Sequence, residues 1–350
     1  QYAIPAMQKQ SPIVAWVVDD TGFVKKGTHS VGVTRQYCGQ VGKQENCRVA
    51  VSLSLSTAEA SLPIAWQLYL PEVWSEDKKR RASAGIPPEI HFQTKPQIAL
   101  QQLRAAVDRE LPKAPVLADA GYGNDTAFRD GITELGLLYA VGVQSSVSVW
   151  APGHSPLPKR KWKGIGRPTK LLRRDARHKP VSVRELAISL PFSAWKTVRW
   201  REGTRDTLHS RFAALRVRPA HRDDWRSEPR AAEWLLIEWP SEEAEPIKYW
   251  FSTLPEDVKL QDLVRLAKHR WIVERDYQEL KQELGLGHYE GRGWRGFHHH
   301  ATLCIAAYGF LVAERSRFSP SARAGQVDLP ACEMPSDFRP RGSPRARGAA

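Results

Sequence analysis

The sequence has few cysteines, an excess of basic over acidic residues, and no long hydrophobic run. The cysteines form no C-x-x-C pair and no zinc-type spacing, so reduced thiols in a cytosolic protein fit best. No basic segment followed by an unbroken apolar run opens the chain, which argues against a secretory signal. The longest nearly apolar run, residues 301–313, is too short to span a bilayer and predicts a buried helix.

What the chain does contain indicates a large folded protein with a polyanionic partner. Its 350 residues are 41% hydrophobic and include 13 Trp, enough for a real core in one large or two ordinary domains. The net charge of +14 favours nucleic acid as the partner, although a solvated basic surface is the alternative reading. Because the chain begins at Gln1 and not at Met, we expect further sequence upstream.

A compact β-branched run over residues 12–20 predicts a buried strand that ends in two acids, Asp19 and Asp20. Successive strand side chains point to opposite faces, so the two carboxylates are not expected to face one site. An Asp that merely caps a turn is the alternative. Lys25 and Lys26 follow in the loop, where they contact phosphate or are simply solvated.

Three further runs, residues 31–39, 46–56 and 62–71, predict strands joined by short links, and therefore an antiparallel start to the sheet. Residues 95–111 have helical periodicity, with Pro96 near the start and Pro112 after the end.

A second carboxylate follows the next predicted strand, Val116 to Ala118. Asp119 stands at its end, Gly121 and Gly123 open the turn, and a helix capped by Asn124 or Asp125 comes next. Strand, acid, glycine-rich turn and helix together often present a catalytic carboxylate at the carboxyl edge of a sheet. A plain turn residue is the alternative for Asp119. Residues 137–143 predict a further strand.

Residues 144–254 differ in character and predict a basic, β-rich insertion. Ten Lys or Arg against one Asp lie between Lys159 and Lys179, and the glycines and proline there favour a loop. Arg167 lies at the centre of a Gly-Arg-Pro triplet like the one with which AT-hooks read the minor groove, and a solvated loop is the alternative. Short β-like runs follow, in TVRWRE, RFAALRVRP, EWLLIEWP and IKYWFSTLP.

Residues 263–281, LVRLAKHRWIVERDYQELK, predict one uninterrupted helix. Arg270, Glu274 and Lys281 are spaced by four and seven residues and therefore share one helical face. A surface ion pair between Arg270 and Glu274 is the alternative. With Asp19 and Asp119, however, Glu274 completes a set of three carboxylates. Oxygen ligands of this kind suit hard divalent cations, and two ions sharing them can activate water and stabilise a leaving 3′ oxygen.

Four stretches make the chain resemble the DDE-superfamily insertion-sequence transposases, specifically the insertion-sequence 701 group. Together they extend over most of residues 12–316 and read VVDDTGFVKKGTHSVGVTRQYCGQVGKQENCRVAVSLS, VLADAGYGNDTAFRDGI, WREGTRDTLHSRFAALRVRPAHR and RWIVERDYQELKQELGLGHYEGRGWRGFHHH. The last contains most of the pattern Y-x2-R-x3-E-x6-K of a related transposase clan. Arg270, Glu274 and Lys281 are in register with it, and Ala267 stands where that pattern has Tyr.

The resemblance implies an α/β protein with an RNase H-like mixed sheet flanked by helices, and a β-rich basic insertion before the last catalytic helix. Asp19, preferred to Asp20, with Asp119 and Glu274 would be the catalytic metal ligands, and would bind Mg²⁺ or Mn²⁺, as two ions. The DNA contacts implied or expected are Lys25, Lys26, Arg167, Trp250, Arg270 and Lys281, with Trp250 stacking on an unpaired base.

The implied function is divalent-metal-dependent DNA strand cleavage and strand transfer at insertion-sequence ends. Double-stranded DNA would be the partner of a homodimer, in a cytoplasmic, nucleoid-associated prokaryotic protein that lacks its N-terminal region. We expect a catalytic core in residues 1–143 and 255–317, the insertion in 144–254, and a disordered basic tail in 318–350. A non-catalytic DNA-binding derivative and an RNase H-like nuclease without strand transfer are the alternatives.

Overall fold

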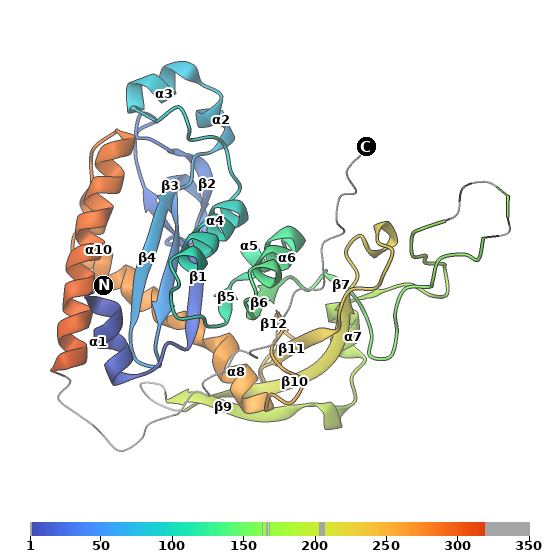
Figure 1. Ribbon diagram of the computed structural model, residues 1–350. Helices are drawn as coiled ribbons and strands as arrows, with labels where there is room; N and C mark the ends of the chain where they lie inside the picture. The colour runs from blue at the N-terminus through green and yellow to red at the C-terminus, as the bar shows by residue number, and fades with distance from the viewer. Residues whose placement is uncertain (1, 163, 166, 168, 203–206, 319–350) are drawn as a thin grey trace.

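A computed structural model describes residues 2–162, 164–165, 167, 169–202 and 207–318. Within these ranges the chain is a mixed α/β protein built on a 12-stranded sheet with helices on both faces (Figure 1). No helix in the described part is long and apolar enough to cross a membrane. The tail expected over 318–350 lies outside these residues from 319 onward.

The first half of the sheet is antiparallel, as the short links predicted. Strand β1 pairs with β3, and β3 pairs in turn with β2 and β4. Strands β5 and β6 then add to β1 in parallel. The bounds are Ala15–Val24 for β1, Thr34–Cys38 for β2, Lys43–Ser56 for β3, Ser61–Leu68 for β4, Val116–Ala118 for β5 and Tyr139–Val143 for β6.

The strands predicted in the insertion are present, and they continue the same sheet. Strand β12 pairs with β6, β11 with β12, and β10 with β11, β9 and β7. The domain boundaries proposed at 143 and 254 therefore fall within one hydrogen-bonded sheet and stay a prediction. The bounds are Ser148–Trp150 for β7, Val181–Ser182 for β8, Lys196–Glu202 for β9, Thr207–Pro219 for β10, Glu233–Trp239 for β11 and Lys248–Ser252 for β12; helix α7, Val183–Ile188, follows β8.

Helices cover the sheet because its central strands are apolar on both faces. In β1, Trp16 and Val18 pack toward α4 and α6, whereas Ala15 and Val17 pack toward α8 and α9. Helix α4 begins with a capping box between Thr94 and Gln97. Helices α1 and α10 lie side by side along the β4 edge (Figure 1). The bounds are Ala3–Gln10 for α1, Glu72–Ser75 for α2, Lys78–Ala84 for α3, Lys95–Asp108 for α4, Ala120–Gly123 for α5, Thr126–Glu134 for α6 and Trp294–Arg317 for α10.

The single helix predicted over 263–281 is wrong in one respect, since the structure breaks it into two. Helix α8, Leu260–Lys268, ends in a 3₁₀ turn, His269–Trp271, and α9, Ile272–Gln282, follows. Within this turn the buried His269 side chain contacts the Ser56 hydroxyl of β3 at 3.2 Å. Periodicity cannot report such a tertiary contact.

Candidate active site

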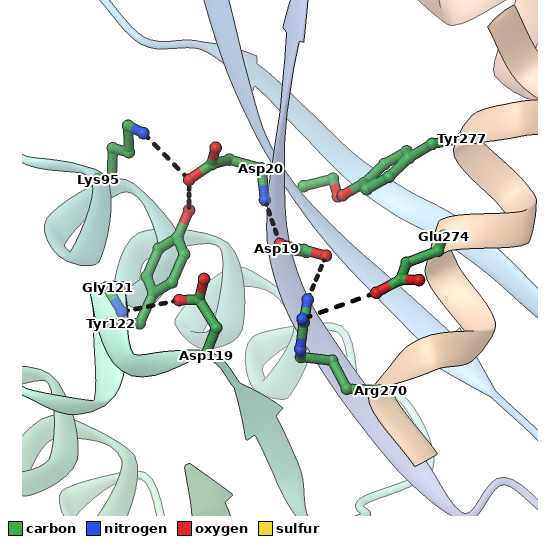
Figure 2. A network of polar contacts seen from close by, with 10 residues as sticks. Asp19, Asp20, Lys95, Asp119, Gly121, Tyr122, Arg270, Glu274 and Tyr277 are labelled. Carbon is green, nitrogen blue, oxygen red and sulfur yellow. Dashed lines mark hydrogen bonds and ion pairs between the residues drawn. The ribbon is translucent and has the colours of Figure 1, made fainter. Parts of the chain in front are cut away.

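The three carboxylates predicted from the sequence line one cavity of about 820 Å³, at the carboxyl end of β5, beside the middle of β1 and against α9. The prediction that the first strand ends at Asp19 and Asp20 is wrong, because β1 continues to Val24 through its pairing with β3. Asp19 comes from β1, Asp119 follows β5, and Glu274 lies in the first turn of α9. Figure 2 shows the three side chains directed toward the same space. The cavity also contains Arg270 and Lys281, so the three residues expected on one helical face do meet there although the helix is broken.

Asp19 is almost fully buried and paired with a cation. Its Oδ2 accepts a hydrogen bond from Arg270 Nη1 at 2.7 Å, and its Oδ1 accepts one from the Asp20 backbone N–H at 2.9 Å. Burial raises the pKa of Asp19 to about 7, and the positive charge of Arg270 opposes that rise only in part. A buried carboxylate with a raised pKa and a specific cationic partner is a common feature of functional sites.

Asp20 lines the same cavity, which corrects the expectation that the two neighbouring acids cannot face one site. The side chains do leave opposite faces of β1, since Asp19 meets Arg270 while Asp20 meets Lys95 Nζ and Tyr122 Oη, both at 3.1 Å. Strand β5, however, pairs with β1 only as far as Val17. Beyond Val17, no strand in the described part of the chain pairs with that side of β1, and the cavity is lined by acids from both faces of the strand.

Asp119 is held at the entrance of the turn by its own helix. Its Oδ1 accepts the Gly121 N–H at 2.9 Å, as the N-cap of α5, and Asp125 caps α6 in the same way. The turn lies close against β6, because a Cβ on Gly123 would lie 2.0 Å from the Gly142 carbonyl oxygen. A glycine is therefore required there, and this close packing fixes the position of Asp119.

The predicted DNA contacts are placed differently from one another. Lys281 Nζ donates to the Gly22 carbonyl at 2.7 Å inside the carboxylate cavity, and burial lowers its pKa to about 8. Lys25 is only 9% exposed and donates to the Tyr289 carbonyl. Lys26 and Arg167 are exposed. The role of each of these residues in DNA binding stays a prediction.

Trp250, the predicted stacking residue, is largely buried in β12 and lines a second cavity of about 830 Å³. Trp200 and Trp271 also line this cavity, and sequence reasoning missed both. Lys268 Nζ lies 4.4 Å from the centre of the Trp200 ring and is paired with the buried Glu238. In β9 the order Arg-Trp-Arg was the signal that could have placed Trp200 on the opposite face from its two basic neighbours.

Other residues that shape the carboxylate cavity were also missed. Lys95 and Tyr122 hold Asp20, and Tyr277 Oη lies 2.7 Å from Ser52 Oγ at the cavity wall. Asp276, buried beneath α9, is hydrogen-bonded to Ser61 and to Tyr308, and its burial raises its pKa to about 6. No sequence motif distinguishes these residues, because their partners lie far away along the chain.

Among the described residues, no group of three or more His, Cys, Asp or Glu side chains stands close enough together to hold a metal ion. The donors nevertheless fit a hard divalent cation, because they are carboxylate oxygens around one cavity. The cation that Asp19 holds is the guanidinium of Arg270, which also lies 3.8 Å from Glu274 Oε1. This guanidinium stands in for a cation between two of the three acids.

A mixed α/β fold with converging carboxylates and a strongly basic chain is the setting of a metal-dependent nuclease. Residues 1–207, more than half of the chain, match the family of DDE superfamily endonucleases, and the chain belongs to this family. Such membership implies dependence on a divalent metal and the binding of DNA.

A curated relative gives a more particular likeness. It is the probable transposase for insertion sequence element IS701 of Microchaete diplosiphon, 30% identical over 170 residues. The aligned region is 48% of this chain and 42% of the relative, so the chain spans less than half the length of that protein. The resemblance to insertion-sequence transposases is thereby confirmed.

Proposed function

We propose that this protein is the catalytic core of an insertion-sequence transposase, which cleaves DNA strands at the element ends and transfers them to target DNA. The convergence of Asp19, Asp119 and Glu274 on one cavity carries the proposal. Residues so far apart in the sequence share a cavity only if the fold brings them together. The family membership and the likeness to a probable transposase support the same reaction class.

The strand arrangement supports an RNase H-like core. Strand β1 lies between an antiparallel neighbour, β3, and a parallel neighbour, β5, with β6 parallel beyond it. Helices α4 and α6 cover one face and α8 and α9 the other. The acids therefore lie where the central strand β1 passes the end of β5, which is the kind of edge at which α/β sheets bind ligands.

Asp19, Asp119 and Glu274 would hold the divalent cations, Mg²⁺ or Mn²⁺ and as two ions. When bound, such ions activate water and stabilise the leaving 3′ oxygen of a phosphodiester. The chain contributes the positions of the ligands. The Gly121 N–H orients Asp119, the Asp20 N–H orients Asp19, and the Asp276 network fastens α9, which carries Glu274.

Cationic groups beside the acids would hold the substrate. Arg270, Lys281 and Lys95 line the carboxylate cavity, and each reaches within hydrogen-bond distance of another group there. A phosphodiester bound between them would exchange these internal contacts for its own oxygens. Lys26 and Arg167, both exposed, would add contacts farther along double-stranded DNA. Synapsis of two element ends makes a homodimer on DNA the expected assembly.

The test is nicking of supercoiled plasmid DNA with and without Mg²⁺, using wild-type protein and Asp119→Asn. We expect metal-dependent nicking by the wild type and a loss of at least about 100-fold in the variant, because removing one ligand weakens the bound charge that stabilises the transition state. Asp257→Asn, which changes an exposed acid outside the cavity, is the matched control and should nick at the wild-type rate. Nicking that survives Asp119→Asn would overturn the assignment.

Two further outcomes separate the alternatives. A covalent joint product between an end-containing oligonucleotide and target DNA identifies strand transfer, whereas cleavage that never yields joints identifies a nuclease. Retained DNA binding without nicking under any metal identifies a non-catalytic DNA-binding protein.

A further inference from the structure

Arg270 is the cation that the carboxylate site holds in this structure. Its Nη1 donates to Asp19 Oδ2 at 2.7 Å, and its Nη2 lies 3.8 Å from Glu274 Oε1 (Figure 2). Both acids are among the three expected to hold divalent cations. The guanidinium therefore hydrogen-bonds to one oxygen of Asp19 and forms an ion pair with Glu274, and a divalent cation bound here would need the same two carboxylates.

The contacts of Arg270 are ones that it can leave. Its side chain is 29% exposed, and within the described ranges it donates a hydrogen bond to Asp19. Glu274, at 67% exposed, is free to turn with it or away from it. The residue lies in the 3₁₀ turn between α8 and α9, and its side chain can change rotamer without any change in the backbone.

The same side chain separates two cavities. The carboxylate cavity and the tryptophan-lined cavity have Asp119, Arg270 and Glu274 in common. Trp200, Trp271 and Lys268 line the second cavity, and aromatic and cationic side chains of this kind bind stacked bases and phosphates in other proteins. Movement of Arg270 away from Asp19 would change the wall shared by the two cavities and leave Asp119 open to both.

We propose that Arg270 and the divalent cation compete for Asp19 and Glu274, so that cation binding displaces the Arg270 side chain into the shared wall, where it is free to meet a DNA phosphate. This rests on the proposed function, in which these acids are metal ligands. Arg270 thus keeps the acids compensated before the cation arrives. Once the cation is bound, Arg270 becomes a positioning group for the substrate. Binding of the cation and release of Arg270 to bind a phosphate therefore occur together.

The first experiment measures Mn²⁺ affinity by electron paramagnetic resonance, without DNA, over a series of pH values above neutral. The proteins are compared where affinity no longer changes with pH, because Arg270→Gln also removes a charge that lowers the pKa of Asp19. We expect Arg270→Gln to bind Mn²⁺ about tenfold more tightly than the wild type, because a charge-assisted hydrogen bond no longer opposes binding. Arg315→Gln is the matched control. It also removes one positive charge from a pair with an α9 acid, Glu279, but it lies outside both cavities, so its affinity should match the wild type.

The outcomes separate the inference from the function beneath it. Equal or weaker binding by Arg270→Gln, with wild-type binding that Asp19→Asn abolishes, overturns the competition and leaves the metal site standing. Absence of binding by the wild type and by every variant overturns the proposed metal-dependent function itself.

A second measurement uses only the wild-type protein, in case Arg270→Gln fails to fold. Phenylglyoxal modifies accessible arginines, and mass spectrometry of the peptides reports the rate at each residue. We expect Mg²⁺ to accelerate modification of Arg270 severalfold and to leave the exposed Arg315 unchanged. Slower or unchanged modification of Arg270 at Mg²⁺ concentrations that saturate the site would overturn the displacement.

Discussion

Protonation of His269 should weaken the fold between neutral and mildly acidic pH. His269 is buried in the same 3₁₀ turn as Arg270, and its Nε2 lies 3.2 Å from Ser56 Oγ. Burial lowers its pKa to about 4, while a backbone hydrogen bond at Thr57 opposes that change. The ordinary value of 6.5 applies to the unfolded chain. The folded protein therefore holds His269 neutral over a range in which the unfolded chain binds a proton.

The sign and the size follow from these two values. Because the folded pKa is the lower one, the stabilising contribution is complete above pH 6.5 and is lost as pH falls toward 4. The full difference of about 2.5 pKa units corresponds to about 3 kcal/mol. Lowering the pH from about 7.5 to about 5.5 should remove about 1.3 kcal/mol of the free energy of unfolding.

The assay is urea unfolding of wild type and His269→Gln at the two pH values. Asp19 and Asp276 titrate with the opposite sign, since burial raises both their pKa values and falling pH then favours the folded state. The relevant quantity is therefore the difference between the two proteins and not the wild-type curve alone. His269→Gln should lose about 1.3 kcal/mol less than the wild type on acidification. Equal losses in both proteins would refute the reasoning.

Three other predictions concern packing, a buried ion pair and metal binding. Gly123→Ala should destabilise the fold by about 3 kcal/mol in urea unfolding, because its Cβ would lie 2.0 Å from a backbone oxygen. Gly27→Ala is the control, since its Cβ would meet open space and should change the stability little. Equal unfolding midpoints for the two variants would contradict this reasoning. Lys268→Met should lower the free energy of unfolding by about 3–5 kcal/mol, because it leaves Glu238, which is 4% exposed, without its cation. Adding Glu238→Leu should recover most of that loss, and no recovery would show that packing dominates. Mg²⁺ at 100 times its dissociation constant should raise the free energy of unfolding of the wild type by about 2.7 kcal/mol, and should not do so for Asp19→Asn. An equal rise in both proteins would place the ion elsewhere.

Local patterns predicted much of the fold. The compact β-branched run over residues 12–20 predicted a buried strand, and the apolar run before Asp119 predicted β5. The capping residues Thr94 and Asp125 are local as well, because each bonds a backbone N–H only three residues away. Such features need no information about distant residues.

The turn at His269 and the pairing of Asp19 escaped prediction. A 3.6-residue period continues across residues 263–281, whereas the turn lies where His269 contacts Ser56, which is 213 residues away in sequence. Strand alternation likewise predicted that Asp19 and Asp20 cannot face one site. Both line the same cavity, because the pairing of β5 with β1 ends at Val17, and where a neighbouring strand ends is a property of the sheet.

By itself, the sequence identified the three acids proposed as metal ligands: one in a strand, one after a second strand, and one on a later helix. Residue type and local periodicity contain that information. Only the tertiary structure decided that these acids share one cavity, that Arg270 lies between two of them, and that a second, tryptophan-lined cavity adjoins it. The physical reason is that burial and Coulombic pairing depend on distances in space between residues separated by more than 100 positions in the chain.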